Sequence, residues 1–279
     1  MSNTLQAQQS CPLATHRPAS RRAFFIESII RMNVYLIIAV IAVIFIIYIG
    51  IMAKYSSTRR KKQIAQFSSD HTELGIDNEQ LSILTFGAIS AILHRENFWV
   101  MSPQQGLDKS FYGLKRQWKI TSKEEAQSTL NTLLGLGASN EVDIRIKSES
   151  IKGLTKIQNE ISKLLKIPTE AVTSITSTFA YDLSRAVEVA KWSFWNGYLT
   201  EEEMWASIAK IPEMARQRST DWEEYSISFL LGFTLDIPSP EELDECHIIV
   251  KHLLSGTSWD YSGMRIPAIY TDIQFNAQE

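Results

Sequence analysis

The feature that most constrains this chain is an unbroken run of twenty apolar residues from Val34 to Ala53. About 20 apolar residues are needed for an α-helix to cross the hydrocarbon core of a bilayer. Tyr35 and Tyr48 lie towards the two ends of the run, where aromatic side chains favour the membrane interface. Because isoleucine covers every face of the run, a buried helix of a soluble protein is a poor alternative. We therefore expect one transmembrane helix over residues 33–54, in contact with the lipid bilayer through Val34 to Ala53.

A cleaved signal peptide is the other explanation for an apolar segment near an N-terminus. Here the apolar stretch and the leader before it are both too long, and no small-x-small cleavage site follows. Residues 1–32 indicate a disordered, basic tail, and residues 55–78 indicate a basic polar linker. Residues 79–279 remain for one soluble domain, which is ample length for a hydrophobic core.

Basic residues flank the apolar run on both sides, and their distribution predicts its orientation. Four precede the run and five follow it: Arg17, Arg21, Arg22 and Arg31, then Lys54, Arg59, Arg60, Lys61 and Lys62. The second group is denser, and the positive-inside rule places the more basic flank in the cytoplasm. We therefore expect the C-terminal domain to be cytoplasmic, with the second group near anionic lipid head groups.

The overall charge and the cysteines argue against several classes of protein. A net charge of −3 over 279 residues lacks the basic excess typical of nucleic-acid-binding domains, so we expect no nucleic-acid partner. Cys11 and Cys246 lie on opposite sides of the apolar run, which argues against a disulfide and provides no metal-binding spacing. The sequence has no Gly-rich phosphate loop, nucleophile elbow or two-His metalloprotease helix. We expect no metal and no cofactor.

Hydrophobic residues recur at helical spacing from Glu79 nearly to the C-terminus, which predicts an all-α domain. Helices are expected over residues 107–118 and 141–166. Pro168 is well placed to open the next helix, because proline is favoured in the first turn. A later helix from Asp221 is expected to end at Gly232.

The stretch from Phe179 to Trp205 has the strongest pattern and predicts a helical hairpin. One helical stripe passes through Ile175, Phe179, Asp182, Ala186, Val189 and Ser193. Asp182 stands among apolar positions, where an unpaired carboxylate is costly. Arg185 lies three residues on and can reach it. The pair is either a structural contact that fixes how the helix docks or the floor of a ligand or catalytic pocket.

Acidic and aromatic residues on this hairpin and beyond it form the candidate site. The cluster comprises Asp182, Arg185, Trp192, Tyr198, Glu203, Trp205, Asp221, Trp222 and Glu224. If the helices fold back on one another, several of these side chains line one cleft, where carboxylates in unlike environments can perform acid–base chemistry. The alternative is that the charges cap helices, as Thr200 and Glu203 do in a capping box, while the tryptophans fill the core. No catalytic residue is assigned.

These residues also resemble the core signature of a bacterial family, the domain of unknown function 1266, which includes the enterobacterial YbeU- and YbeR-type proteins. The residues that carry the resemblance are Tyr181, Asp182, Leu183, Ser184, Arg185, Ala186, Val187, Trp192, Gly197, Tyr198, Glu201, Glu202, Glu203 and Trp205. The family pattern is an Ala-Trp-Asp-x-x-Arg helix, a Gly-Tyr turn, an acidic helix start and a downstream Ser-Trp-Glu-Glu segment. Here Tyr181 replaces the usual tryptophan, and the segment from Thr220 to Tyr225 has an inserted residue. The resemblance covers roughly residues 79–259 and implies an α-helical domain without an established activity.

Two functions are consistent with these features. The first is a non-enzymatic module at the bacterial inner membrane, anchored by a single span, which binds a protein partner or a component of the envelope, or has a regulatory role. It predicts an exposed apolar or aromatic patch on the folded domain. The second is a membrane-anchored, hydrolase-like enzyme that uses an acidic and aromatic cleft around Asp182 and Arg185. It predicts a pocket in which at least two carboxylates converge and Arg185 faces an anionic substrate group.

Overall fold

The computed structural model describes residues 20–70, 75–104, 106–236 and 240–276. Most of the expected N-terminal tail, residues 1–19, lies outside these ranges. The chain divides into two compact units, Met1–Ser57 and Thr58–Glu279.

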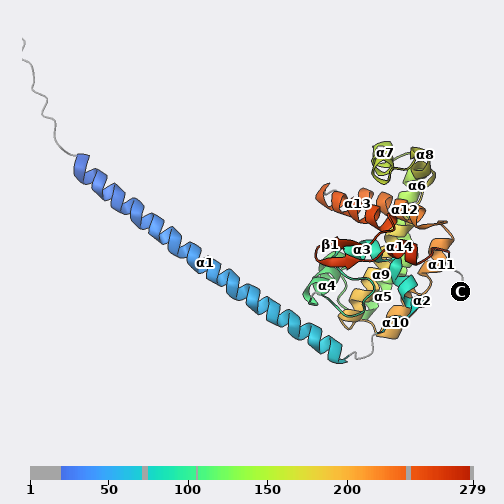
Figure 1. Ribbon diagram of the computed structural model, residues 1–279, viewed down its shortest axis with the longest axis horizontal. Helices are drawn as coiled ribbons and strands as arrows, with labels where there is room; N and C mark the ends of the chain where they lie inside the picture. The colour runs from blue at the N-terminus through green and yellow to red at the C-terminus, as the bar shows by residue number, and fades with distance from the viewer. Residues whose placement is uncertain (1–19, 71–74, 105, 237–239, 277–279) are drawn as a thin grey trace, which may run out of the picture. The chain divides into compact units, whose positions relative to one another are not determined.

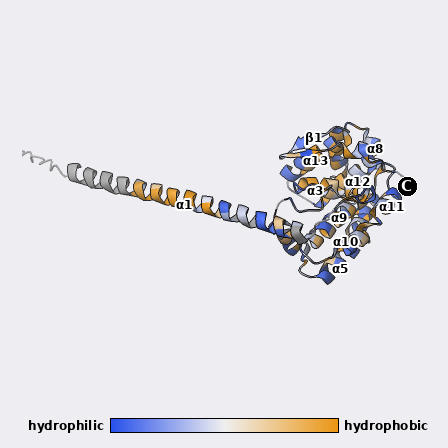
Figure 2. Cartoon of the chain, turned by 60° about the horizontal axis from the view of Figure 1, so that its bottom comes forward, coloured by the Kyte–Doolittle hydropathy of each residue, from blue (hydrophilic) through white to orange (hydrophobic). Residues whose placement is uncertain are grey.

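The apolar run lies within one long helix, α1 (Ser20–Asp70). Its segment Val34–Tyr55 has a mean hydropathy of 3.1, none of it is buried, and it is long and apolar enough to cross a membrane. Figure 2 shows the hydrophobic middle of α1 in orange and the more polar turns that follow it in blue. The helix begins within the expected tail and ends within the expected linker. Residues 54–70 contain neither glycine nor proline, so nothing in that sequence interrupts a helix.

The second unit is helical nearly throughout its described residues, which confirms the all-α class. After the C-terminal part of α1, its elements are α2 (Asn78–Thr85), α3 (Ala88–Leu93), α4 (Asp108–Gly113), the π-helix η1 (Leu114–Trp118), α5 (Lys123–Leu134), α6 (Gly137–Lys147), α7 (Leu154–Leu165), α8 (Thr169–Ser174), α9 (Phe179–Trp195), α10 (Glu201–Ile208), α11 (Ile211–Arg216), α12 (Trp222–Asp236), α13 (Pro240–Leu254), β1 (Trp259–Tyr261), β2 (Met264–Ile266) and α14 (Ile269–Asp272). The two strands form an antiparallel hairpin that pairs Trp259 with Ile266.

Helix α9 is the centre of this domain. Every one of its residues except Arg185 is buried, and it packs against α3, α5, α10 and α12 (Figure 1). A helix surrounded on all sides has to be apolar on most of its faces, and the sequence of α9 meets this requirement. The charged residues it does carry are therefore placed inside the domain, where each requires a partner.

The structure corrects the expected start of α9. Pro168 opens only the short helix α8, and four residues separate the end of α8 from the start of α9. In the connection, the Asp143 carboxylate accepts hydrogen bonds from the Thr178 amide at 2.7 Å and the Thr178 hydroxyl at 3.1 Å. These bonds satisfy the polar groups of a buried turn. Ile175 therefore lies outside the helix whose face it was expected to share.

Two other helix boundaries also differ from expectation. The stretch 141–166 breaks into α6 and α7, and both Glu149 and Gly153 adopt positive φ angles, 52° and 82°, at the break. Helix α12 continues through Gly232 to Asp236. A Cβ atom at Gly232 would lie 2.6 Å from the Cβ atom of Tyr181, so this glycine allows α12 to approach α9 closely and does not end the helix.

Candidate functional site

Asp182 and Arg185 form the expected ion pair, and a third residue completes it. The Asp182 side chain is 1% exposed, and one of its oxygens accepts hydrogen bonds from the Ser139 amide at 2.9 Å and the Ser139 hydroxyl at 2.7 Å. Its other oxygen accepts a bond from the Arg185 guanidinium at 2.5 Å. The carboxylate thus has two neutral donors on one oxygen and a charged donor on the other, which is the arrangement that makes a buried charge tolerable.

Arg185 is held on its outer side as well. Its guanidinium donates to the Asp236 carboxylate at 3.2 Å and lies 3.8 Å from the centre of the Tyr181 ring. The Tyr181 hydroxyl donates to the same carboxylate at 2.9 Å. Burial, together with this carboxylate, raises the pKa of Tyr181 well above its usual value, so the phenol stays protonated. Two carboxylates and an aromatic face already engage the positive charge of Arg185.

A cleft of about 410 Å³ opens beside Arg185, between α3, η1, α9, α12 and α13. This volume lies within the range of small-molecule and peptide side-chain pockets. The lining residues are Ser90, Leu93, His94, Gln117, Trp118, Tyr181, Arg185, Glu188, Phe229, Phe233, Asp236, Glu242 and Glu245. They include four carboxylates against one arginine and one histidine, with aromatic rings on the walls. The cleft is therefore acidic and aromatic.

His94 and Glu188 make direct contact on one wall of the cleft, through the His94 Nδ1 atom and a Glu188 carboxylate oxygen. The same nitrogen is 3.1 Å from the carbonyl oxygen of Ser90. Burial alone would lower the pKa of His94, but the Glu188 carboxylate outweighs it and the pKa is raised above its usual value. A carboxylate that orients an imidazole in this way is an arrangement found in acid–base catalysts, although structural pairs show it too.

A further buried lysine and glutamate lie next to this pair. The Lys191 ammonium donates to the Asn97 carbonyl at 3.1 Å, and the Trp192 indole donates to the two Glu96 carboxylate oxygens at 3.0 and 3.1 Å. Burial lowers the pKa of Lys191 to about 8, against the opposing charges of Glu96 and Glu188. Burial also raises the pKa of Glu96. These buried groups stabilise the C-terminal part of α9 only while each keeps its hydrogen-bond or ion-pair partner.

The Lys191→Met variant is expected to remove a pH dependence of folding. In the unfolded chain a lysine has a pKa of about 10.4, whereas in the folded protein Lys191 titrates at about 8. Between these values the unfolded chain binds more protons, so the folded state gains stability as pH rises. Relative to the variant, the unfolding free energy of the wild type should rise by about 3 kcal/mol from about pH 8 to about pH 10.5. Urea unfolding at a series of pH values measures this, and parallel curves for the two proteins would contradict it.

Arg185 lines this cleft, but Asp182 and the other seven candidate residues do not. Glu203 caps α10 together with Thr200 and contacts Lys123. The Glu224 amide donates to the Asp221 carboxylate at 2.9 Å, and this bond caps the start of α12. The remaining four are tryptophans and a tyrosine in or against the core: Trp192, Tyr198, Trp205 and Trp222. In this group the charged residues therefore cap helices, and the aromatic residues pack in or against the core.

Sequence reasoning missed the cleft residues His94, Glu188, Glu242 and Glu245, and the buried pair of Glu96 and Lys191. One signal was present in the sequence. Charged residues recur every three positions along the otherwise apolar helix α9, at Asp182, Arg185, Glu188 and Lys191. Such a spacing places successive side chains on neighbouring parts of the helix surface. Within the ranges that the structure describes, no group of three or more His, Cys, Asp or Glu side chains is arranged to hold a metal ion.

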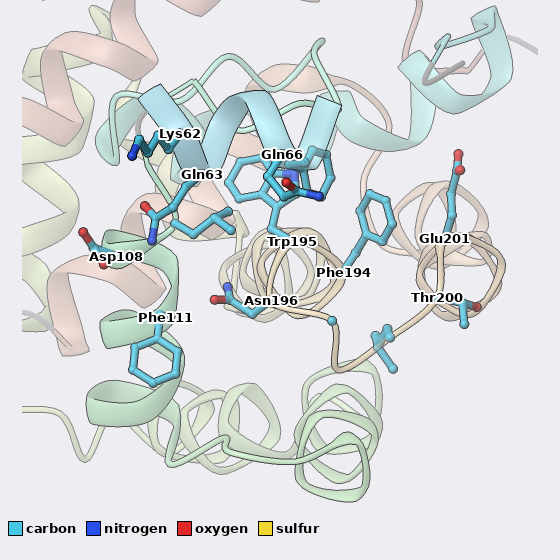
Figure 3. A pocket seen from close by; sticks show the side chains of 14 residues that line it. Lys62, Gln63, Gln66, Asp108, Phe111, Phe194, Trp195, Asn196, Thr200 and Glu201 are labelled. Carbon is cyan, nitrogen blue, oxygen red and sulfur yellow. The ribbon is translucent and has the colours of Figure 1, made fainter. Parts of the chain in front are cut away.

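A second, larger hollow of about 910 Å³ lies at the C-terminal end of α9. Figure 3 shows Lys62, Gln63 and Gln66 on one side of it, Trp195 and Asn196 in the middle, and Phe111 beside them. Apolar residues form much of its lining: Phe67, Leu107, Phe111, Phe194, Trp195 and Leu199. The rings of Phe67 and Phe194 pack edge to face with centres 5.5 Å apart. This hollow shares no lining residue with the acidic cleft.

Comparisons with known proteins give one match. The family model described as "Protein of unknown function (DUF1266)" matches residues 113–262, more than half of the chain. This range includes the helical hairpin from Phe179 to Trp205 and the segment from Thr220 to Tyr225, whose residues carry the resemblance described above. No curated protein and no solved structure matches the chain.

Proposed function

We propose that this chain, which belongs to the family described as "Protein of unknown function (DUF1266)", is a membrane-anchored module that binds a basic segment of a partner protein and catalyses no reaction. We place it in the bacterial inner membrane with one span and with its helical domain in the cytoplasm. The apolar segment Val34–Tyr55 supports the anchor, and the denser basic flank after it supports the orientation. The resemblance to a bacterial family supports the location.

The observation that carries the binding proposal is the combination of aromatic walls and carboxylates in the cleft of Arg185. Trp118, Phe229 and Phe233 supply apolar and aromatic surface. Glu242 lies towards solvent and adds a negative charge to the lining. Surfaces of this composition favour lysine and arginine side chains, through ion pairs and contacts between cations and aromatic rings.

The contacts of Arg185 support the binding of a cation by this cleft. Its guanidinium lies over Tyr181 and donates to Asp236. A basic side chain of a partner would make the same two kinds of contact, with an aromatic ring and with a neighbouring carboxylate of the cleft. The same contacts argue against an anionic substrate. Since Asp182 and Asp236 already neutralise Arg185, little of its charge is left to attract an anion.

A binding measurement with full-length protein in detergent tests the proposal. The probe is a fluorescent peptide of alternating arginine and leucine, and a peptide of alternating glutamate and leucine is its counterpart. We expect only the basic peptide to bind. Glu242→Lys should weaken its binding about tenfold or more, because it reverses a charge in the lining. Asp244→Lys is the matched control, since Asp244 lies on the same helix, is exposed and is not part of the cleft. Equal loss in both variants, or equal binding of both peptides, would overturn the proposal.

The second candidate function is a hydrolase-like activity at the same cleft, and the contact between His94 and Glu188 favours it. A nucleophile is harder to assign, because the Ser90 hydroxyl is buried and hydrogen-bonded to the Ser184 hydroxyl at 2.8 Å. Turnover of p-nitrophenyl acetate by the wild type decides between the two functions. Hydrolysis that is lost in His94→Gln while the fold is retained would replace the binding proposal with an enzymatic one.

A further inference from the structure

We infer that the face formed by α4 and η1 docks onto an anionic phospholipid surface. The inference rests on the proposed membrane anchor and adds a second contact between the domain and the bilayer. The residues that it uses, Phe111, Tyr112, Lys115 and Arg116, do not line the acidic cleft, although Gln117 and Trp118 of η1 do.

Charge is the first observation. Beyond Lys62 the sequence has 19 basic and 30 acidic residues, so the domain as a whole is acidic. The stretch from Asp108 to Lys119, which contains α4 and η1, nevertheless has four basic residues and one acidic residue. The Lys109 ammonium donates to the His94 carbonyl, whereas Lys115, Arg116 and Lys119 are exposed. An anionic surface attracts such a patch and repels most of the remaining domain. The local charge therefore selects one face of the domain for contact with lipid.

Exposed aromatic residues are the second observation. Phe111 is 37% exposed and Tyr112 is 51% exposed, and both belong to the small group of large hydrophobic residues exposed on the described part of the domain. Each ring has a basic partner, with the Lys115 ammonium 5.8 Å from the centre of Phe111 and the Arg116 guanidinium 5.1 Å from that of Tyr112. Aromatic rings beside basic groups are typical of surfaces that lie at a membrane interface.

The patch is fixed in place by its inner side. Leu114 is fully buried, and the Asn196 side chain donates to the Ser110 hydroxyl at 2.9 Å. A Cβ atom at Gly113 would lie 2.3 Å from the Trp192 ring, so the segment lies directly on α9. With its inner side held this way, the segment presents its aromatic and basic side chains to solvent at little further cost in conformational entropy.

The length of chain between the patch and the apolar segment is the third observation. Phe111 and Lys62 line the same hollow, and Lys62 is seven residues from Tyr55, the last residue of the apolar segment. Seven residues span at most about 25 Å even when fully extended.

Asp108 and Glu201 also line that hollow, so we assign lipid phosphates to Lys115 and Arg116 on the outer face and not to the hollow itself.

The test is hydrogen–deuterium exchange of full-length protein reconstituted in vesicles of phosphatidylcholine, with or without phosphatidylglycerol. We expect amides of residues 107–119 to exchange about fivefold more slowly, or slower still, in the anionic vesicles. The double variant Lys115→Glu/Arg116→Glu should lose this protection. The control is Lys147→Glu/Lys152→Glu, which makes the same charge change at exposed lysines elsewhere and should keep it.

Separate outcomes report on the patch and on the anchor. Equal exchange in both kinds of vesicle, or protection that survives in the Lys115→Glu/Arg116→Glu variant, would overturn the docking inference; the second result would indicate a protein contact at this face. Extraction of the chain from the vesicles by alkaline carbonate would instead refute the anchor. In that case the comparison of amide exchange between the two lipid mixtures still reports whether residues 107–119 contact anionic lipid, because a peripheral protein binds anionic vesicles through the same charges.

Discussion

The Asp182→Ala variant is expected to lose about 3–5 kcal/mol of unfolding free energy. The substitution removes the acceptor of both Ser139 hydrogen bonds and one of the two carboxylates that hold Arg185. Arg185 is then left as a largely buried cation, and the Ser139 amide is left without its acceptor. Urea denaturation of the full-length protein, followed by tryptophan fluorescence, measures the loss.

Asp236→Ala is the matched control, because it removes the other carboxylate on the same guanidinium. The Asp236 side chain is 57% exposed, so water replaces it and the expected loss is about 1 kcal/mol or less. Asp182→Asn should fall between the two, since the amide oxygen still accepts from Ser139. If Asp182→Ala kept wild-type stability but lost binding of the basic peptide, the pair would be a functional site and the structural interpretation would be wrong.

The features that sequence could predict are those that depend on neighbouring residues. The apolar run that begins at Val34 is one unbroken stretch. The capping box joins Thr200 to Glu203, and the ion pair joins Asp182 to Arg185, so each involves residues only three positions apart. Their physics is local, so spacing and residue type are sufficient to predict them. The family was recognisable for the same reason.

The acidic cleft was not predictable in this way, because distant segments build it. His94 caps the C-terminus of α3, Trp118 belongs to η1, and Glu188 and Glu242 come from α9 and α13. Only the packing of four helices and a π-helix brings these residues together, and no spacing in the sequence encodes it. Ser139 was missed as the partner of Asp182 because the two lie 43 positions apart. The spacing of residues predicted Arg185 as a partner of Asp182, but it could not show that the carboxylate also needed a donor from a second residue.

The Trp222→Ala variant is expected to lose about 3–5 kcal/mol of stability and to loosen the C-terminal segment. The Trp222 ring stacks on Tyr270 with centres 4.3 Å apart and meets Phe275 edge to face at 4.9 Å. Its indole donates to the Ile273 carbonyl at 2.8 Å. One side chain thus attaches the last described residues of the chain to the start of α12. We expect faster hydrogen–deuterium exchange in residues 269–276, together with a lower urea midpoint.

Trp205→Ala is the matched control for this substitution. Trp205 is only half-buried and donates to Glu201 at 3.2 Å within its own helix, so its removal should cost about 1–2 kcal/mol and leave exchange of the C-terminal segment unchanged. A Trp222→Ala protein that is less stable but binds the basic peptide normally would assign this tryptophan to the core. Loss of peptide binding from a variant of unchanged stability would instead extend the binding surface to Trp222, which does not line the acidic cleft.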